Sequence, residues 1–100
     1  TKKYLASGSS DGTVIIWNLR KKDYEKINIK SKVFCLSYSK NGKYILIGAE
    51  KLHIYNTETR NLSIIPTKKP VFSCCFSPDG FYIRYTQSNT VVLKTFDEII

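Results

Sequence analysis

The stretch SSDGTVIIWN, Ser9–Asn18, joins a turn signal directly to a run of residues that favour β-strands. The dipeptide Asp11-Gly12 is typical of tight turns, because glycine adopts positive φ angles without a steric penalty. The residues from Thr13 to Trp17 are β-branched or aromatic, and such side chains pack well on a pleated sheet. Trp17 is the only tryptophan of the chain. The stretch therefore predicts a turn followed by a strand.

Related stretches recur later in the chain at a spacing of 38 residues. VFCLSYSKNGKYI, Val33–Ile45, aligns with VFSCCFSPDGFYI, Val71–Ile83, and TVIIWN, Thr13–Asn18, aligns with KLHIYN, Lys51–Asn56. A third copy of the second motif, TVVLKT, covers Thr90–Thr95. A fixed period of this kind indicates a repeat architecture, in which each repeat is one supersecondary unit.

The middle repeat predicts four short strands, because four runs rich in Val, Ile, Tyr and Phe are separated by turn residues. Asn41-Gly42 supplies one of these turns, and Asp79-Gly80 supplies its equivalent in the next repeat. No helical periodicity of useful length is present. We therefore expect an all-β chain of antiparallel meanders. The four predicted strands of the middle repeat are Val33–Ser39, Tyr44–Ala49, Lys51–Asn56 and Leu62–Pro66.

Two stretches carry a resemblance to a known family. YLASGSSDGTVIIWN, residues 4–18, and FSPDG, residues 76–80, resemble the WD40 repeat of β-propellers. The resemblance implies four-stranded blades, about two and a half of them. Residues 1–30 would be the last three strands of one blade, 31–67 a complete blade, and 68–100 the first three strands of the next. Propellers need roughly 4–8 blades, so we interpret the chain as part of a longer propeller; a ring of several copies is the alternative.

The resemblance also assigns structural roles to four residues of the opening stretch. In WD40 blades an Asp of the turn and a Trp of the following strand belong to a hydrogen-bonded network. Asp11 and Trp17 match these two positions, and Ser7 or Ser9 matches the serine of the same network. A buried indole N–H needs an acceptor, so Trp17 is interpreted as a residue that holds one blade together.

The other two repeats depart from this pattern. Tyr55 and Lys94 stand where the first repeat has Trp17, and Asn89 stands where it has Asp11. These blades are expected to depend on apolar packing instead of the network, so the propeller is degenerate. The lone histidine, His53, falls within a predicted strand, where a partly buried structural role is expected.

The chain carries a formal net charge of +8, from 16 Lys and Arg against 8 Asp and Glu. The resemblance implies that inter-blade loops and the turns between second and third strands share one face. Two readings of this rim stay open: it binds an acidic peptide or an RNA backbone, or it is a solvated lysine surface. The lysines placed on it are Lys30, Lys32, Lys51, Lys68 and Lys69.

The sequence offers no recognisable catalytic machinery. One histidine, carboxylates that lie mostly in turns, and the absence of a phosphate-binding loop predict a non-enzyme without a cofactor or metal. Cys35, Cys74 and Cys75 are interpreted as small apolar residues of a reducing compartment.

Two functions follow as expectations. The first is a protein-interaction scaffold within an intracellular multi-protein complex, in the cytoplasm or nucleus. The alternative is a nucleic-acid-associated propeller in RNA processing, ribosome assembly or translation, using the Lys-rich face. No apolar run is long enough to cross a bilayer, so no membrane partner is expected.

Overall fold

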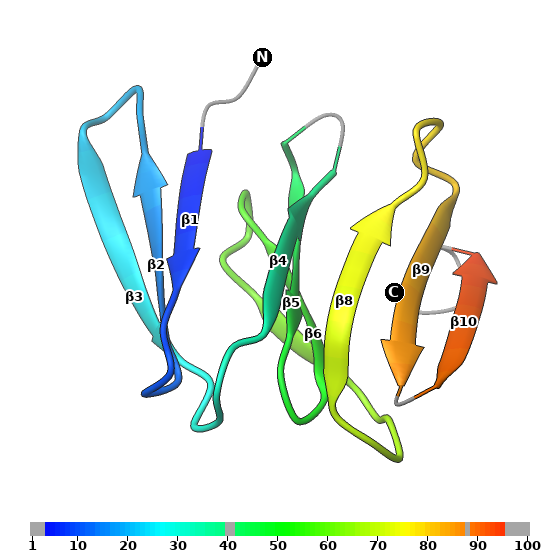
Figure 1. The fold of residues 1–100 in the computed structure, drawn as a ribbon. Coiled ribbons are helices and arrows are strands. Elements are labelled where there is room, and N and C mark those ends of the chain that lie inside the picture. Colours follow the sequence, from blue (N-terminus) through cyan, green and yellow to red (C-terminus); the bar gives the residue numbers. More distant parts are fainter. Residues whose placement is uncertain (1–3, 40–41, 88, 96–100) are drawn as a thin grey trace.

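The computed structural model describes residues 4–39, 42–87 and 89–95, and these residues form three antiparallel sheets that follow one another along the chain (Figure 1). The prediction of an all-β fold is confirmed. The first sheet contains β1 (Tyr4–Gly8), β2 (Thr13–Asn18) and β3 (Asp23–Asn28). The second contains β4 (Cys35–Tyr38), β5 (Tyr44–Gly48), β6 (Leu52–Asn56) and β7 (Leu62–Ile65). The third contains β8 (Val71–Phe76), β9 (Tyr82–Gln87) and β10 (Thr90–Thr95).

Each sheet is a meander in which consecutive strands pair with their neighbours. The first strand of the middle repeat begins at Cys35 and not at Val33, although the Phe34 amide still donates to the Gly48 carbonyl oxygen at 2.8 Å. Asn41, the first residue of the predicted Asn-Gly turn, lies outside the described residues. The described part of the chain includes no helix of the length and hydropathy needed to cross a membrane.

The Asp-Gly turn of the opening stretch contacts the loop that leads into the second sheet. Gly12 has a φ of 89°, and a Cβ at this position would lie 2.9 Å from the backbone nitrogen of Ser31. The Ile29 amide donates to the Gly12 carbonyl oxygen at 2.7 Å. Glycine is therefore required here both by the backbone angle and by the close approach of the neighbouring loop.

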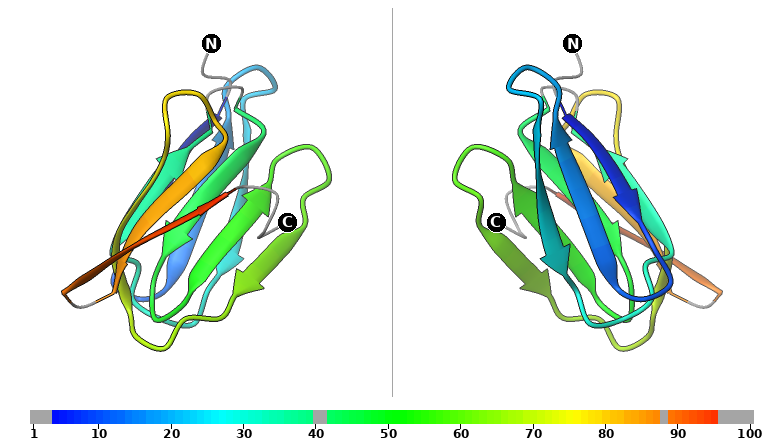
Figure 2. Two further views of the ribbon diagram at one scale, coloured as in Figure 1. Left: turned by 90° about the vertical axis from the view of Figure 1, so that its right-hand side faces the viewer. Right: turned by 90° about the vertical axis from the view of Figure 1, so that its left-hand side faces the viewer.

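The apolar core forms two layers, one on each side of the second sheet. Successive side chains of a strand point to opposite faces, so Ile45 and Ile47 face the first sheet while Leu46, between them, faces the third. All three side chains are fully buried. Burying a side chain of this size stabilises the fold by about 1.5–3 kcal/mol. The two side views in Figure 2 show the three sheets stacked one behind the other.

The outer faces of the first and third sheets remain exposed. Leu5 and Tyr24 are open on the first sheet, and Val91 and Leu93 are open on the third. Among the sheets of the described residues, only the middle one has a neighbour on both faces, which is why its β5 and β6 contain the longest runs of buried residues. This unequal burial is the pattern expected of stacked repeats, in which each unit buries its faces against adjacent units.

Candidate functional site

Four loops gather at one edge of the three sheets, which lies at the lower end of Figure 1 and is called the lower edge below. They are residues 9–12, 29–34, 49–51 and 66–70, and they join β1 to β2, β3 to β4, β5 to β6 and β7 to β8. The edge also carries two exposed carboxylates, Asp11 and Glu50. All five lysines predicted from the sequence lie on it with exposed side chains: Lys30, Lys32, Lys51, Lys68 and Lys69.

Hydrogen bonds between neighbouring loops hold the lower edge together. The Glu50 amide donates to the Ser31 hydroxyl at 3.2 Å, which ties the β5–β6 turn to the β3–β4 loop. The Lys68 amide donates to the side-chain oxygen of Gln87 at 3.2 Å, which ties the β7–β8 loop to the end of β9. Lys30 adopts a positive φ of 66°, and its amide donates to the side-chain oxygen of Asn28 at 2.8 Å. The backbone positions of these lysines are therefore fixed by local bonds.

An exposed aromatic pair lies beside the lysines, and the sequence reasoning did not anticipate it. The rings of Phe34 and Phe72 have centroids 4.7 Å apart and are tilted by 59°. Phe34 is 36% exposed and Phe72 is 52% exposed. The ammonium group of Lys32 lies 5.7 Å from the centroid of the Phe34 ring. The repeated dipeptide Val-Phe at 33–34 and 71–72 was the available signal, because equivalent positions of adjacent repeats lie side by side.

Hydrogen bonds from Ser9 and Thr13 surround Asp11 at the turn between β1 and β2. The Ser9 hydroxyl donates to the Asp11 carboxylate, which also accepts the Thr13 amide at 2.9 Å. These bonds, with the Ser9 contribution the largest, hold the pKa of Asp11 below its ordinary value. A shallow recess of about 280 Å³ lies beside this turn on the first sheet, and Ser7, Ser9 and Asp11 line it. Asp11 thus shapes the turn and stays ionised.

Trp17 lies on the outer face of the first sheet, away from this turn. Trp17 is 39% exposed and packs against Tyr24, with ring centroids 5.0 Å apart. Among the described residues no hydrogen bond reaches its indole N–H. The reason is the alternation of β2: Val14 and Ile16 occupy the core face, so Trp17 points to the outer face, near the end of the strand remote from Asp11.

His53 lies inside β6 and is almost completely buried. Its side chain is 6% exposed, and Nδ1 has no hydrogen-bond partner. Burial lowers the pKa of His53, and the positive charge of Lys51 lowers it further. The imidazole is therefore held in its neutral form inside the second sheet. This placement suits a structural group.

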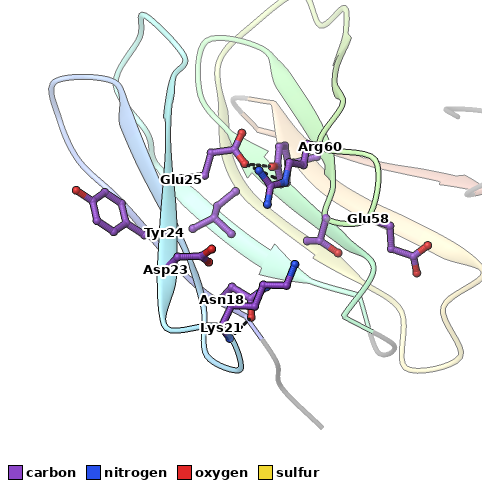
Figure 3. A pocket seen from close by; sticks show the side chains of 10 residues that line it. Asn18, Lys21, Asp23, Tyr24, Glu25, Glu58 and Arg60 are labelled. Carbon is purple, nitrogen blue, oxygen red and sulfur yellow. Dashed lines mark hydrogen bonds and ion pairs between the residues drawn. The ribbon is translucent and has the colours of Figure 1, made fainter.

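A polar pocket of about 280 Å³ opens between the first and second sheets at the opposite, upper edge (Figure 3). The Tyr55 hydroxyl donates to Glu25 at 2.8 Å, and the Arg60 guanidinium lies 3.8 Å from the same carboxylate oxygen. Lys21 and Asp23 also line the pocket. In Figure 3 the side chains of Glu25 and Arg60 point toward each other, whereas Tyr24 points away from them. One ion pair of this pocket, between Glu25 and Arg60, is thus formed within the chain.

The two edges differ in what they leave available to a partner. The upper edge mixes cations with Asp23, Glu25 and Glu58, and part of this charge is paired internally. The lower edge has five exposed lysines against two carboxylates, and one of the carboxylates is engaged by Ser9 and Thr13. In the described ranges, no group of three or more His, Cys, Asp and Glu side chains is placed to hold a metal ion.

Comparison with known families explains the repeat pattern. Residues 1–18 match the family model described as WD domain, G-beta repeat. The chain carries a WD40 repeat. Its three sheets have the fold of β-propeller blades, about two and a half of them. No curated protein sequence matches the chain.

Three solved structures are similar to this chain over nearly its whole length. The β-propeller domain of Myceliophteria thermophila Cps50 (Swd1) matches with a TM-score of 0.81 and 23% identity over 98% of the chain. The structure of U3-55K and that of the RRP9 WD40 repeats each match with a TM-score of 0.84 and 17% identity over 97%. The chain covers 34%, 34% and 33% of these three solved chains, so it spans about a third of their length.

Proposed function

We propose that this chain is a non-catalytic part of a WD40 propeller that holds other proteins of a complex through its lower edge, in the cytoplasm or nucleus. The observation that carries the proposal is the set of five exposed lysines at this edge together with the exposed Phe34–Phe72 pair, whose Phe34 ring lies beside Lys32. The remaining blades of the propeller would belong to the same, longer protein.

The charge of the lower edge favours an acidic partner. Exposed charges of one sign attract an oppositely charged surface and raise the association rate, with a range of about 8 Å at physiological salt. The aromatic pair supplies what the lysines lack, because buried aromatic anchors account for much of the affinity at protein interfaces. The best fit is a partner segment that combines acidic side chains with an apolar group able to cover Phe34 and Phe72.

The test is a charge reversal of the lower edge. Lys30, Lys32, Lys68 and Lys69 are changed together to Glu in the full-length protein, and the affinity for captured partners is measured at several salt concentrations. We expect the affinity to fall and its dependence on salt to flatten. Unchanged affinity with an unchanged salt dependence would contradict the proposal.

A matched control separates the lower edge from net charge. Changing Lys68 and Lys69 to Glu alters the formal charge by the same amount as changing Arg20 and Lys21 to Glu at the upper edge, and all four side chains are exposed. The lower-edge variant is expected to lose binding while the upper-edge variant keeps it. Equal losses in both would show that overall charge, not this surface, governs association.

The same surface favours a second candidate, a nucleic-acid-associated propeller. Lysines contact phosphates, and exposed aromatic rings can stack on bases. Capture with and without nuclease distinguishes the two functions, because RNA-dependent partners disappear after digestion. The logarithm of the binding constant for a single-stranded RNA would also fall linearly with the logarithm of the salt concentration. The slope would be about −0.7 for each phosphate contacted.

A further inference from the structure

Two of the three cysteines meet between the second and third sheets. Cys35 is the first residue of β4, and Cys74 lies within β8. Both side chains pack on the apolar layer that these sheets share. Their sulfur atoms are 2.9 Å apart, and the two residues are 39 positions apart in the sequence.

The surroundings leave room for this contact. Gly48 pairs with Cys35 across β4 and β5, and a Cβ at Gly48 would collide with the Cys35 sulfur. Both cysteines are half-buried, so a small oxidant can reach them. Cys75 follows Cys74 directly and therefore points to the other face of β8, away from Cys35. The chain thus contains one pair in contact and a neighbouring cysteine that serves as an internal control.

The hydrogen bond between the two sulfurs makes the thiols unequal. The contact with Cys74 lowers the pKa of Cys35, and this effect outweighs its burial. The same bond, together with burial, raises the pKa of Cys74. The thiolate is the reactive form of cysteine. Cys35 is therefore the group that reacts first with an electrophilic oxidant, and Cys74 is placed to react with the product.

We propose that Cys35 and Cys74 are a redox modification site, at which peroxide forms a reversible disulfide between neighbouring blades. The Cys35 thiolate attacks one oxygen of hydrogen peroxide, and the O–O bond breaks to give a sulfenic acid and, after protonation, water. The Cys74 sulfur then attacks the sulfenic sulfur, the S–O bond breaks, and a second water leaves. Two thiols are oxidised by two electrons while the peroxide is reduced to two molecules of water.

Only a small movement of the two sulfur atoms is needed to form the disulfide. A disulfide bond is about 2.05 Å long, so the two sulfurs need to approach by about 0.9 Å from their present separation. The bond would join β4 to β8 and close a loop through the whole of the second sheet, which restricts the unfolded chain more than the folded one. Oxidation is therefore expected to tighten the contact between these blades.

The test is peptide mapping of the full-length protein after graded treatment with hydrogen peroxide and blocking of free thiols. We expect a Cys35–Cys74 cross-linked peptide that dithiothreitol removes, and a melting temperature several degrees higher in the oxidised protein. The variant Cys75→Ser keeps both effects, while Cys35→Ser and Cys74→Ser each lose both. A disulfide through Cys75, cross-links only between molecules, or sulfinic acid without a cross-link would each overturn the proposal.

Discussion

The buried His53 makes stability depend on pH in a defined window. Its side chain is 6% exposed inside β6, Nδ1 has no partner, and burial followed by the charge of Lys51 lowers its pKa in the folded protein. In the unfolded chain the same imidazole takes up a proton near pH 6.5. Between these two pKa values the unfolded state binds more protons than the folded state, so stability falls as the pH falls.

The size of the effect follows from one proton. The free energy of unfolding changes by at most about 1.4 kcal/mol per pH unit for a single group. If the folded state stays unprotonated throughout, lowering the pH from 7 to 5.5 costs about 1.3 kcal/mol. The loss begins near pH 6.5 and ends once the pH is below the folded pKa. Hydrogen bonds from Ser9 and Ser77 hold the pKa values of Asp11 and Asp79 low, so these carboxylates stay ionised in this window.

The assay is chemical denaturation at pH 7.5, 6.5 and 5.5 for the native protein and His53→Leu. The variant should lose most of the pH dependence in this range. It should also be more stable at pH 7.5, by about 1–3 kcal/mol, because no unpaired buried nitrogen remains. As a control, Lys51→Gln removes the nearby charge and should reduce the loss at pH 5.5. An equally steep loss in native protein and His53→Leu would refute the reasoning.

Four further substitutions test the contacts within and between the sheets. Leu46→Ala should destabilise the protein by about 2–5 kcal/mol, because Leu46 is fully buried. Leu62→Ala, at a position 37% exposed, should destabilise it clearly less, and denaturant titration compares the two variants. Tyr55→Phe removes the hydroxyl that donates to Glu25 and should cost about 0.5–1.5 kcal/mol at neutral pH, and equal stability of the two proteins would contradict a contribution from this bond. Gly48→Ala should lower the melting temperature, since its Cβ would meet a neighbouring sulfur and a backbone oxygen, and an unchanged melting temperature would show that the neighbours yield easily.

Much of the fold could be predicted because its signals are local. The Asp-Gly turns, the β-branched runs and the 38-residue repeat each depend on residues that are close in sequence, and the structure has a strand at each predicted run of the middle repeat. The position of the lysines at the lower edge could also be predicted, because the loops of a meander alternate regularly between its two ends. These features follow from backbone preferences and from the alternation of strands and turns.

The surroundings of Trp17 show where local reasoning ends. The residue type and its place in a strand were correct, but burial depends on which face of β2 meets another sheet. Val14 and Ile16 face the second sheet, so Trp17 faces outward and packs on Tyr24. The family resemblance supplied the position of the tryptophan, and the packing of this chain determined its partner.

The sequence by itself determined the strands and the turns, because neighbouring residues set them. It also determined the repeat and the excess of basic charge, because both can be read directly from the order and kind of residues. Only the tertiary structure decided which residues from different repeats meet: Cys35 with Cys74, Phe34 with Phe72, and Glu25 with Tyr55. The physical reason is the stacking of sheets. Cys35 points toward the following sheet and Cys74 toward the preceding one, so their contact exists only when two blades pack face to face.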